Sequence, residues 1–187
     1  MQMAQNHKKI NNKDLYKPLS NKQKGYAEIL AEARRLEFEY CKSNFLYFAS
    51  NYCVIEDKDA DPVIQPFTPW EGQKQLIEQI RRHKLVCILK ARQLGITWIA
   101  IYWALWAIIF HPGKTVIALS KTEEDSKEII RRATLVLDNM PSLLQGGGIT
   151  YVKTAMQIIV NYGDSKVQGW FKSFTASESS GRSFTAN

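Results

Sequence analysis

The stretch Lys90-Ala91-Arg92-Gln93-Leu94-Gly95-Ile96-Thr97 decides the fold expected for this chain. It separates the apolar run of residues 85–89, which has the length of a buried strand, from the apolar run of residues 98–110, which is long enough only for a helix. In the phosphate-binding pattern G-x-x-x-x-G-K-S/T, Gly95 falls on the second glycine and Thr97 on the hydroxyl residue. Lys90 stands at the first glycine, and Ile96 stands where the lysine is usual. The order of strand, loop and helix favours a phosphate-binding loop with its lysine moved to the front over a solvated turn.

A loop of this kind has the chemistry that a nucleoside triphosphate needs. Phosphates bind to backbone N–H groups at a helix N-terminus, to a cation near the β and γ oxygens, and to Mg²⁺ held by a hydroxyl group. The amides of residues 90–97 supply the first of these. Lys90 supplies the cation if its side chain curls back over the loop, and Thr97 supplies the hydroxyl for Mg²⁺.

About twenty residues before the loop lies a group suited to an adenine base. It consists of two aromatic rings, a proline and an amide, namely Phe67, Trp70, Pro69 and Gln73. The rings can stack on the base, and the glutamine offers a donor and an acceptor for its N6 and N7 edge. The cofactor expected at the site is therefore ATP with Mg²⁺. The alternative is an aromatic anchor that docks the helix expected over residues 71–83.

At these residues the chain resembles the large terminase subunits of tailed bacteriophages. Residues 89–97 are similar to that family's variant Walker A loop, which often places its lysine first and carries Arg-Gln in the middle. Residues 67–73 resemble its adenine-binding segment, and residues 177–183 resemble the stretch before its Walker B strand. The resemblance extends from about Phe45 to Asn187.

The resemblance implies an ATPase that drives double-stranded DNA into a procapsid. The partners it implies are DNA, a portal protein and a small terminase subunit, and the setting is a ring-shaped homo-oligomer in the cytoplasm of an infected bacterial host. It also implies that Arg182, just after Gly181, reaches the γ-phosphate on a neighbouring subunit as a trans-acting arginine finger. The alternative is that Arg182 tethers its own loop.

The carboxylates that the family uses for hydrolysis are not found after the loop. In the family, a strand ending in Asp-Glu follows the Gly-Arg-Ser segment, whereas this sequence ends at Asn187. Residues 52–57 end in two acids, but they precede the loop and so are not a Walker B strand. We expect the N-terminal part of a longer protein, without its Walker B strand and nuclease domain. Such a chain binds ATP without sustained hydrolysis.

Composition limits the class of protein. The 187 residues, 45% of them hydrophobic, suit one sizeable core, and a net charge of +7 favours a polyanionic partner. Three cysteines without paired spacing fit a reducing cytoplasm better than a disulfide framework or a zinc site. The apolar run of residues 98–110 is shorter than the roughly 20 residues that a bilayer requires, so no membrane association is expected.

The chain is expected to divide into a mobile basic arm, residues 1–25, and a partial phosphate-loop ATPase domain, residues 26–187. The arm has six lysines and one acid. Periodicity predicts one helix or two over residues 26–51, a strand over 115–120, a helix from about 123 to Pro141, and short strands over 149–152, 156–162 and 167–174. The fold class is α/β, with a mainly parallel sheet between helices, an added β-hairpin and an N-terminal helical arm.

Two other functions fit part of this pattern. One is a helicase-like DNA-dependent ATPase, although such enzymes usually keep the lysine directly after the glycine, where this chain has Ile96. The other is a DNA-binding or scaffold module in which the loop is vestigial.

Overall fold

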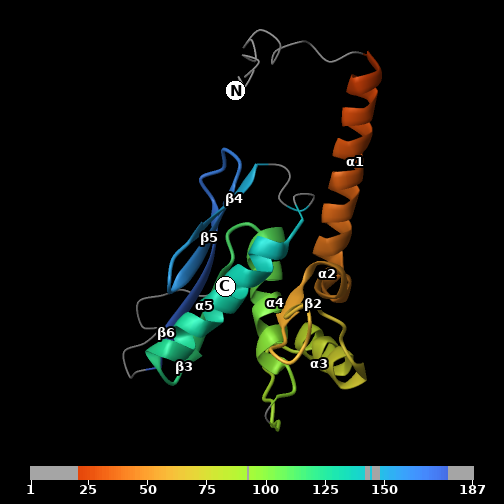
Figure 1. Cartoon of the computed structure of the whole chain (residues 1–187). Helices are drawn as coiled ribbons and strands as arrows, with labels where there is room; N and C mark the ends of the chain where they lie inside the picture. Colours follow the sequence, from red (N-terminus) through yellow and green to blue (C-terminus); the bar gives the residue numbers. More distant parts are fainter. Residues whose placement is uncertain (1–20, 92, 142–143, 145–147, 177–187) are drawn as a thin grey trace, which may run out of the picture.

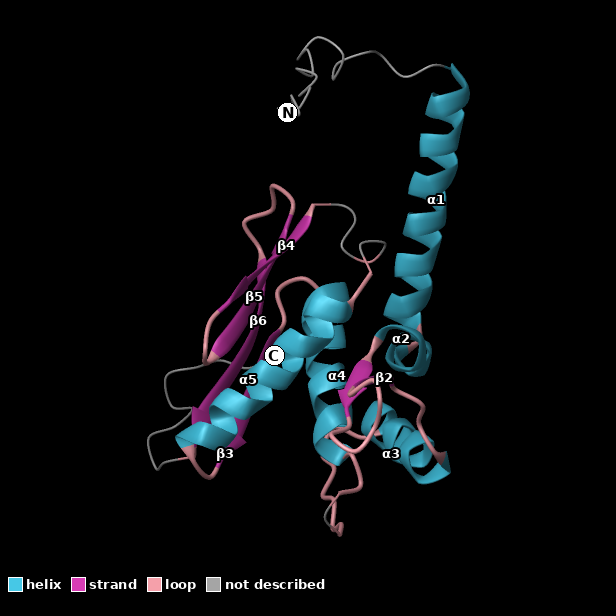
Figure 2. Cartoon of the chain, viewed as in Figure 1, coloured by secondary structure: helices cyan, strands magenta, loops and turns pink. Residues whose placement is uncertain are grey.

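The structure, a computed structural model, describes residues 21–91, 93–141, 144 and 148–176. Figures 1 and 2 show the arrangement of its helices and strands. In chain order these are α1 (Asn21–Ser43), α2 (Phe45–Tyr52), β1 (Val54–Glu56), β2 (Ile64–Pro66), α3 (Glu71–Arg82), α4 (Ile96–Phe110), β3 (Thr115–Ser120), α5 (Glu123–Asn139), β4 (Ile149–Lys153), β5 (Gln157–Tyr162) and β6 (Gln168–Thr175).

The larger sheet is mixed, with strand order β3-β6-β5-β4. β3 and β6 are parallel, whereas β5 pairs antiparallel with both β4 and β6. Short turns join β4, β5 and β6, and such turns produce antiparallel neighbours. Only the long connection through α5 and the β4–β5 hairpin returns the chain parallel to β3. The prediction of a mainly parallel sheet was therefore wrong for the described residues, while the α/β class and the hairpin are confirmed.

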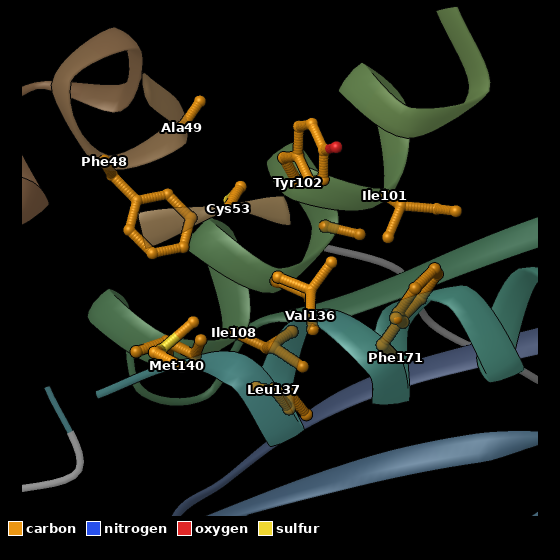
Figure 3. Packing of buried hydrophobic residues seen from close by; sticks show 14 of the residues in the cluster. Phe48, Ala49, Cys53, Ile101, Tyr102, Ile108, Val136, Leu137, Met140 and Phe171 are labelled. Carbon is orange, nitrogen blue, oxygen red and sulfur yellow. The ribbon is translucent and has the colours of Figure 1, made fainter. Parts of the chain in front are cut away.

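Both helices that pack on this sheet cover the same face. Phe171 of β6 belongs to the same buried cluster as Val136 and Leu137 of α5 and Ile108 of α4 (Figure 3). Side chains on the opposite face, such as Ile159 and Trp170, are only half-buried. Among the described residues, the sheet is thus covered on one side and does not lie between helices as predicted.

The helix α4 forms the centre of the core. Most of its residues are buried, as expected for a helix that is apolar on every side. Its polar ring atoms bond to backbone: the Tyr102 hydroxyl donates to the Val54 carbonyl at 2.9 Å, and Trp106 Nε1 donates to the Cys41 carbonyl at 2.8 Å. In the described part of the chain, no helix combines the length and apolar character needed to span a membrane.

The N-terminal helical region consists of two helices. Asn44 separates them, and its side chain accepts a hydrogen bond from Tyr47 N at 3.0 Å, which caps the start of α2. α1 begins at Asn21 and projects from the body of the molecule (Figure 1). Residues 21–25 of the expected arm therefore belong to a helix, and residues 1–20 lie outside the described residues.

The helix predicted from about residue 123 to Pro141 is confirmed as α5. Thr122 caps it by accepting a hydrogen bond from Asp125 N at 3.1 Å, and three acids occupy its first turn. β3 also occupies the predicted residues.

Residues 85–89 form no strand, so this prediction was wrong. Leu85 is 91% exposed and Leu89 is fully exposed. A strand needs a hydrogen-bonded neighbour, and an apolar run is buried only where another surface covers it. Neither is found for this run among the described residues, and it forms part of the loop that projects between α3 and α4 (Figure 2).

Candidate functional site

The candidate phosphate loop turns sharply before α4. Gly95, the N-cap of this helix, has φ 70° and ψ 8°, and Gln93 has φ 64°. Left-handed backbone is uncommon for residues other than glycine. Two such residues in three positions turn the chain into the helix, and they explain why glycine stands at position 95.

The start of α4 has backbone donors left for a ligand. Trp98 N and Ile99 N both donate to the Gly95 carbonyl, at 3.0 and 3.3 Å. Gly95 has no side chain to cap the helix, so the N–H groups of Ile96 and Thr97 have no acceptor within it. The Thr97 side chain is exposed at the same turn. The positive end of the helix dipole and these donors together suit an anion.

Lys90 is exposed at the front of the loop. Its ammonium nitrogen has a long contact of 3.4 Å with the Ala91 carbonyl, and no salt bridge to a described residue. The charge of Lys90 is therefore available to an incoming ligand. Arg92, the other cation of the loop, lies outside the described residues.

Gln73 joins the predicted adenine segment to the phosphate loop. Its Nε2 donates to the Leu94 carbonyl at 3.0 Å, and its Oε1 accepts from Trp70 N at 3.3 Å. The side chain is buried and lies so close to Gly95 that a Cβ there would be 2.7 Å from Gln73 Nε2. Both ends of the amide are engaged, so its visible role is to hold the loop against the start of α3. Recognition of adenine by Gln73 stays a prediction.

The other members of the predicted adenine group are divided between the core and the surface. Phe67 and Pro69 are buried, and the Phe67 ring packs on Tyr102 with ring centres 4.8 Å apart. This is the anchoring role given above as the alternative. Trp70 is 52% exposed, and its ring lies against Gly72. Of these four residues, only Trp70 presents a ring to solvent.

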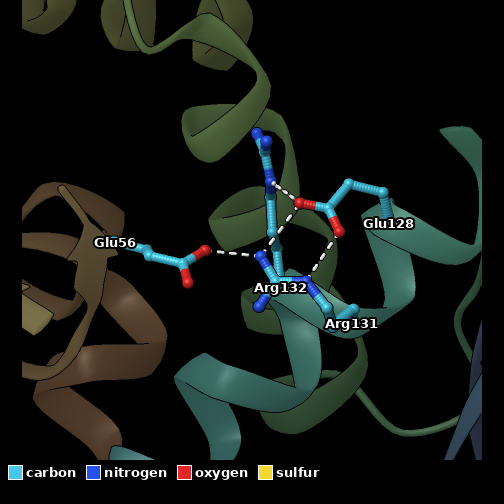
Figure 4. A network of polar contacts seen from close by, with 4 residues as sticks. All are labelled: Glu56, Glu128, Arg131 and Arg132. Atoms are coloured by element: carbon cyan, nitrogen blue, oxygen red, sulfur yellow. Dashed lines mark hydrogen bonds and ion pairs between the residues drawn. The ribbon is translucent and has the colours of Figure 1, made fainter. Parts of the chain in front are cut away.

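A charged network that was not predicted lies beside the first turns of α4. Arg131 of α5 bonds to both Glu128 and Glu56, and Arg132 also bonds to Glu128 (Figure 4). The Arg132 guanidinium lies 5.1 Å from the centre of the Trp98 ring, next in sequence to Thr97. Hydrogen bonds from Arg131 and Arg132 lower the pKa of Glu128 to about 2.

Part of this network could have been read from the sequence. Glu128, Arg131 and Arg132 have the spacing of neighbours on one helix face, which indicates ion pairs along α5. Glu56 lies 75 residues from Arg131, and no sequence signal links the two. These partly exposed arginines form a contact between α5, β1 and α4.

The remaining predicted site residues cannot be placed. Arg182 lies outside the described residues, as does the whole stretch of residues 177–187. Within the described ranges, no group of three or more His, Cys, Asp or Glu side chains is arranged to hold a metal ion. Thr97 is thus the predicted Mg²⁺ ligand that the structure does place, exposed at the start of α4.

Comparisons with known proteins leave the family of the chain unassigned. No protein-family model matches it. Among solved structures, it is similar to the ATPase domain of the large terminase of Thermus phage P74-26, with 13% sequence identity and a TM-score of 0.39. The match covers 59% of this chain and 51% of that one, so the chain spans about half the length of that structure. A match of this size does not establish membership of a family.

Proposed function

We propose that residues 90–97 bind the phosphates of ATP–Mg²⁺ and that the chain belongs to the ATPase part of a DNA-packaging motor of the large-terminase type. One contact carries the nucleotide-binding part of this proposal. The bond from Gln73 Nε2 to the Leu94 carbonyl joins the predicted base segment to the predicted phosphate loop across 21 residues of sequence. The segment predicted to bind the base and the loop predicted to bind the phosphates therefore lie side by side.

The residues of the loop fit the separate needs of a triphosphate. The N–H groups of Ile96 and Thr97 would donate hydrogen bonds to phosphate oxygens at the start of α4. Lys90, which has no salt bridge to a described residue, would neutralise the phosphate charge. The exposed Thr97 hydroxyl would hold Mg²⁺, and the ion would supply positive charge to the phosphate oxygens. Phosphoryl transfer depends mostly on such positioning and charge neutralisation.

The DNA-packaging part of the proposal rests on sequence. The lysine at the front of the loop favours a terminase over a helicase-like ATPase, and a net charge of +7 suits a double-stranded DNA partner. In this proposal a portal protein, a small terminase subunit and further copies of the chain complete the motor. Arg182 would act in trans on a neighbouring subunit's nucleotide.

One observation favours the rival in which the loop is vestigial. Residues 85–89, which should lead into the loop as a buried strand, pair with no strand in the described part of the chain and are largely exposed. A DNA-binding or scaffold module would have no need of a rigid strand at this point. Nucleotide binding separates the two functions.

The role of Thr97 gives a specific test of the proposal. Binding of a fluorescent ATP analogue to the purified chain should be stronger with Mg²⁺ than with EDTA, and Thr97→Ala should remove most of that difference. Thr150→Ala, an exposed threonine of β4, should leave the difference intact. Absence of binding by the folded wild-type chain would favour the vestigial loop, and a full Mg²⁺ effect in Thr97→Ala would remove Thr97 as the ligand.

A further inference from the structure

One face of α1 has an apolar stripe with the spacing of a coiled-coil seam. The stripe consists of Tyr26, Ile29, Ala33, Leu36 and Tyr40, which follow one another at alternating intervals of three and four residues. These are the a and d positions of successive heptads. The side chains of Tyr26 and Ile29 are each 67% exposed, and that of Leu36 is 56% exposed. A helix face that meets only water usually carries polar residues, so this apolar exposure is unusual.

The stripe faces away from the rest of the molecule. The opposite side of α1, including Ala31, Arg34 and Phe38, lines a cavity of about 540 Å³ against the end of α4 and the sheet. Residues 33 and 36 lie about half a turn around the helix from these, at 3.6 residues per turn. At the base the stripe meets the body, where the Tyr40 ring touches Tyr47 at 4.5 Å between ring centres.

The helix is already held in place for a partner. Its C-terminal end is anchored by Phe38 and by the fully buried Cys41, and the Tyr52 hydroxyl donates to Glu37 at 2.5 Å. An isolated helix of this length is only marginally stable in water, so the anchor supplies order that a free peptide lacks. A partner helix would find the stripe preformed.

Three of the residues beside the stripe are acidic, whereas Leu30, at an e position, is apolar. In the heptad defined by the stripe, Glu32 and Glu39 occupy g positions and Glu37 occupies an e position. The Glu32 and Glu39 side chains are more than half exposed. Their ion pairs are with Arg35 and Lys42, at c positions on the same helix, and such exposed pairs contribute little. The seam thus presents apolar knobs flanked by carboxylates.

These carboxylates indicate which kind of partner the stripe can bind. A second parallel copy would place Glu32 against Glu37, and an antiparallel copy would place the g-position glutamates against each other, so like charges meet in both cases. An anionic lipid surface would meet the same carboxylates. We propose that the stripe Tyr26, Ile29, Ala33, Leu36 and Tyr40 docks a helix of another protein, with apolar a and d positions and Lys or Arg at its e and g positions.

Two designed peptides test this proposal on the full chain. Both have about three heptads with Leu at a and d, and they carry either Lys or Glu at every e and g position. Fluorescence anisotropy should show binding of the Lys peptide only, weakened about tenfold or more by Leu36→Ala. In the double variant Glu32→Lys, Glu39→Lys the preference should reverse. Glu28→Lys, at an exposed c position, makes the same kind of charge change off the seam and should keep the original preference.

Circular dichroism should first be used to check that each variant is folded. Failure of the folded wild-type chain to bind the Lys peptide would overturn the proposal, as would equal binding of both peptides. Leu36-dependent self-association in sedimentation would instead assign the stripe to a second copy. Leu36-dependent binding to phosphatidylglycerol vesicles, without peptide binding, would assign it to a membrane surface.

Discussion

At the scale of single residues, Gln73 determines how the candidate site is built. Its amide has one bond to each of two segments, the Trp70 amide at the start of α3 and the Leu94 carbonyl in the loop. A buried amide with both ends engaged is a stable link, because leaving either end unpaired would cost free energy. Gln73 therefore fixes where the loop begins its turn into α4.

Gly95→Ala should destabilise this turn. The left-handed backbone of Gly95 costs a residue with a Cβ about 1–2 kcal/mol. The new Cβ would also displace the Gln73 amide, 2.7 Å away. Denaturant unfolding should show at least this loss. Gly25→Ala in α1, where a Cβ meets nothing within 4 Å, should be neutral or stabilising by up to about 1 kcal/mol. Equal stability of the two variants would show that the turn is not constrained.

The exposed residues of the site were the easier ones to predict from sequence. Lys90, Gly95 and Thr97 follow the spacing of the phosphate-binding pattern, and the structure places Thr97 and Lys90 where solvent reaches them. The bond from Gln73 to the Leu94 carbonyl was not predicted, because the same amide suits a base edge or a backbone carbonyl equally well. The burial of Phe67 depends on Tyr102, 35 positions away, which no local pattern reveals.

At the scale of elements, the network of Glu56, Glu128, Arg131 and Arg132 joins α5 to β1 and to the first turns of α4. Arg132 also covers the Trp98 ring, so the network borders the helix that starts the candidate site. Its effect on stability should depend on the charge of Glu128.

Glu128→Gln should change how stability depends on pH. The bonds from Arg131 and Arg132 lower the pKa of Glu128 from an ordinary 4.5 to about 2 in the folded chain. Its stabilising contribution is therefore complete above the unfolded value and is lost as the pH falls through the folded value. The difference in melting temperature between wild type and Glu128→Gln should therefore shrink as the pH falls from 4.5 to about 2.

Glu124→Gln, one turn earlier on the exposed side of α5, is the control and should show no such trend. A difference between wild type and Glu128→Gln that is constant with pH would mean that the network does not stabilise the fold through this carboxylate.

Elements with periodic patterns and local caps were well predicted. α5 begins at its Thr122 cap, and the strands β4, β5 and β6 lie within a residue or so of their expected ranges. Residues 85–89 show the limit of such patterns. Their apolar side chains favour burial. A buried strand also requires a neighbouring strand and a covering layer, and the residues of the run do not determine either.

At the scale of the whole molecule, α4 is attached to the sheet through the last turn of the helix. The Ile108 carbonyl lies in that turn, where it has no donor within the helix, and the Tyr162 hydroxyl of β5 donates to it. Gly169 of β6 leaves room for this contact, because a Cβ there would lie 2.7 Å from the same carbonyl. The sheet order could not be predicted from sequence, since pairing depends on contacts of this kind between distant residues.

Tyr162→Phe and Tyr151→Phe should have different effects on stability. Tyr162→Phe leaves the Ile108 carbonyl unpaired and should cost about 1–3 kcal/mol in chemical unfolding. The Tyr151 hydroxyl is buried and has no hydrogen-bond partner in the part of the chain that the structure describes. Its removal should be neutral or stabilising. A greater loss in Tyr151→Phe than in Tyr162→Phe would contradict this account of how the sheet holds α4.

The central claim is that the loop at the start of α4 binds a nucleoside triphosphate through Lys90. The measurement is titration calorimetry of ATP–Mg²⁺ with wild type, Lys90→Ala and the control Lys84→Ala, which removes an equally exposed lysine just outside the loop. Lys90→Ala should lose about 1.5–3 kcal/mol of binding free energy, the scale of a charged hydrogen bond, while Lys84→Ala should bind like wild type. Equal affinity in Lys90→Ala and wild type, or no binding by any of the three folded proteins, would contradict the claim.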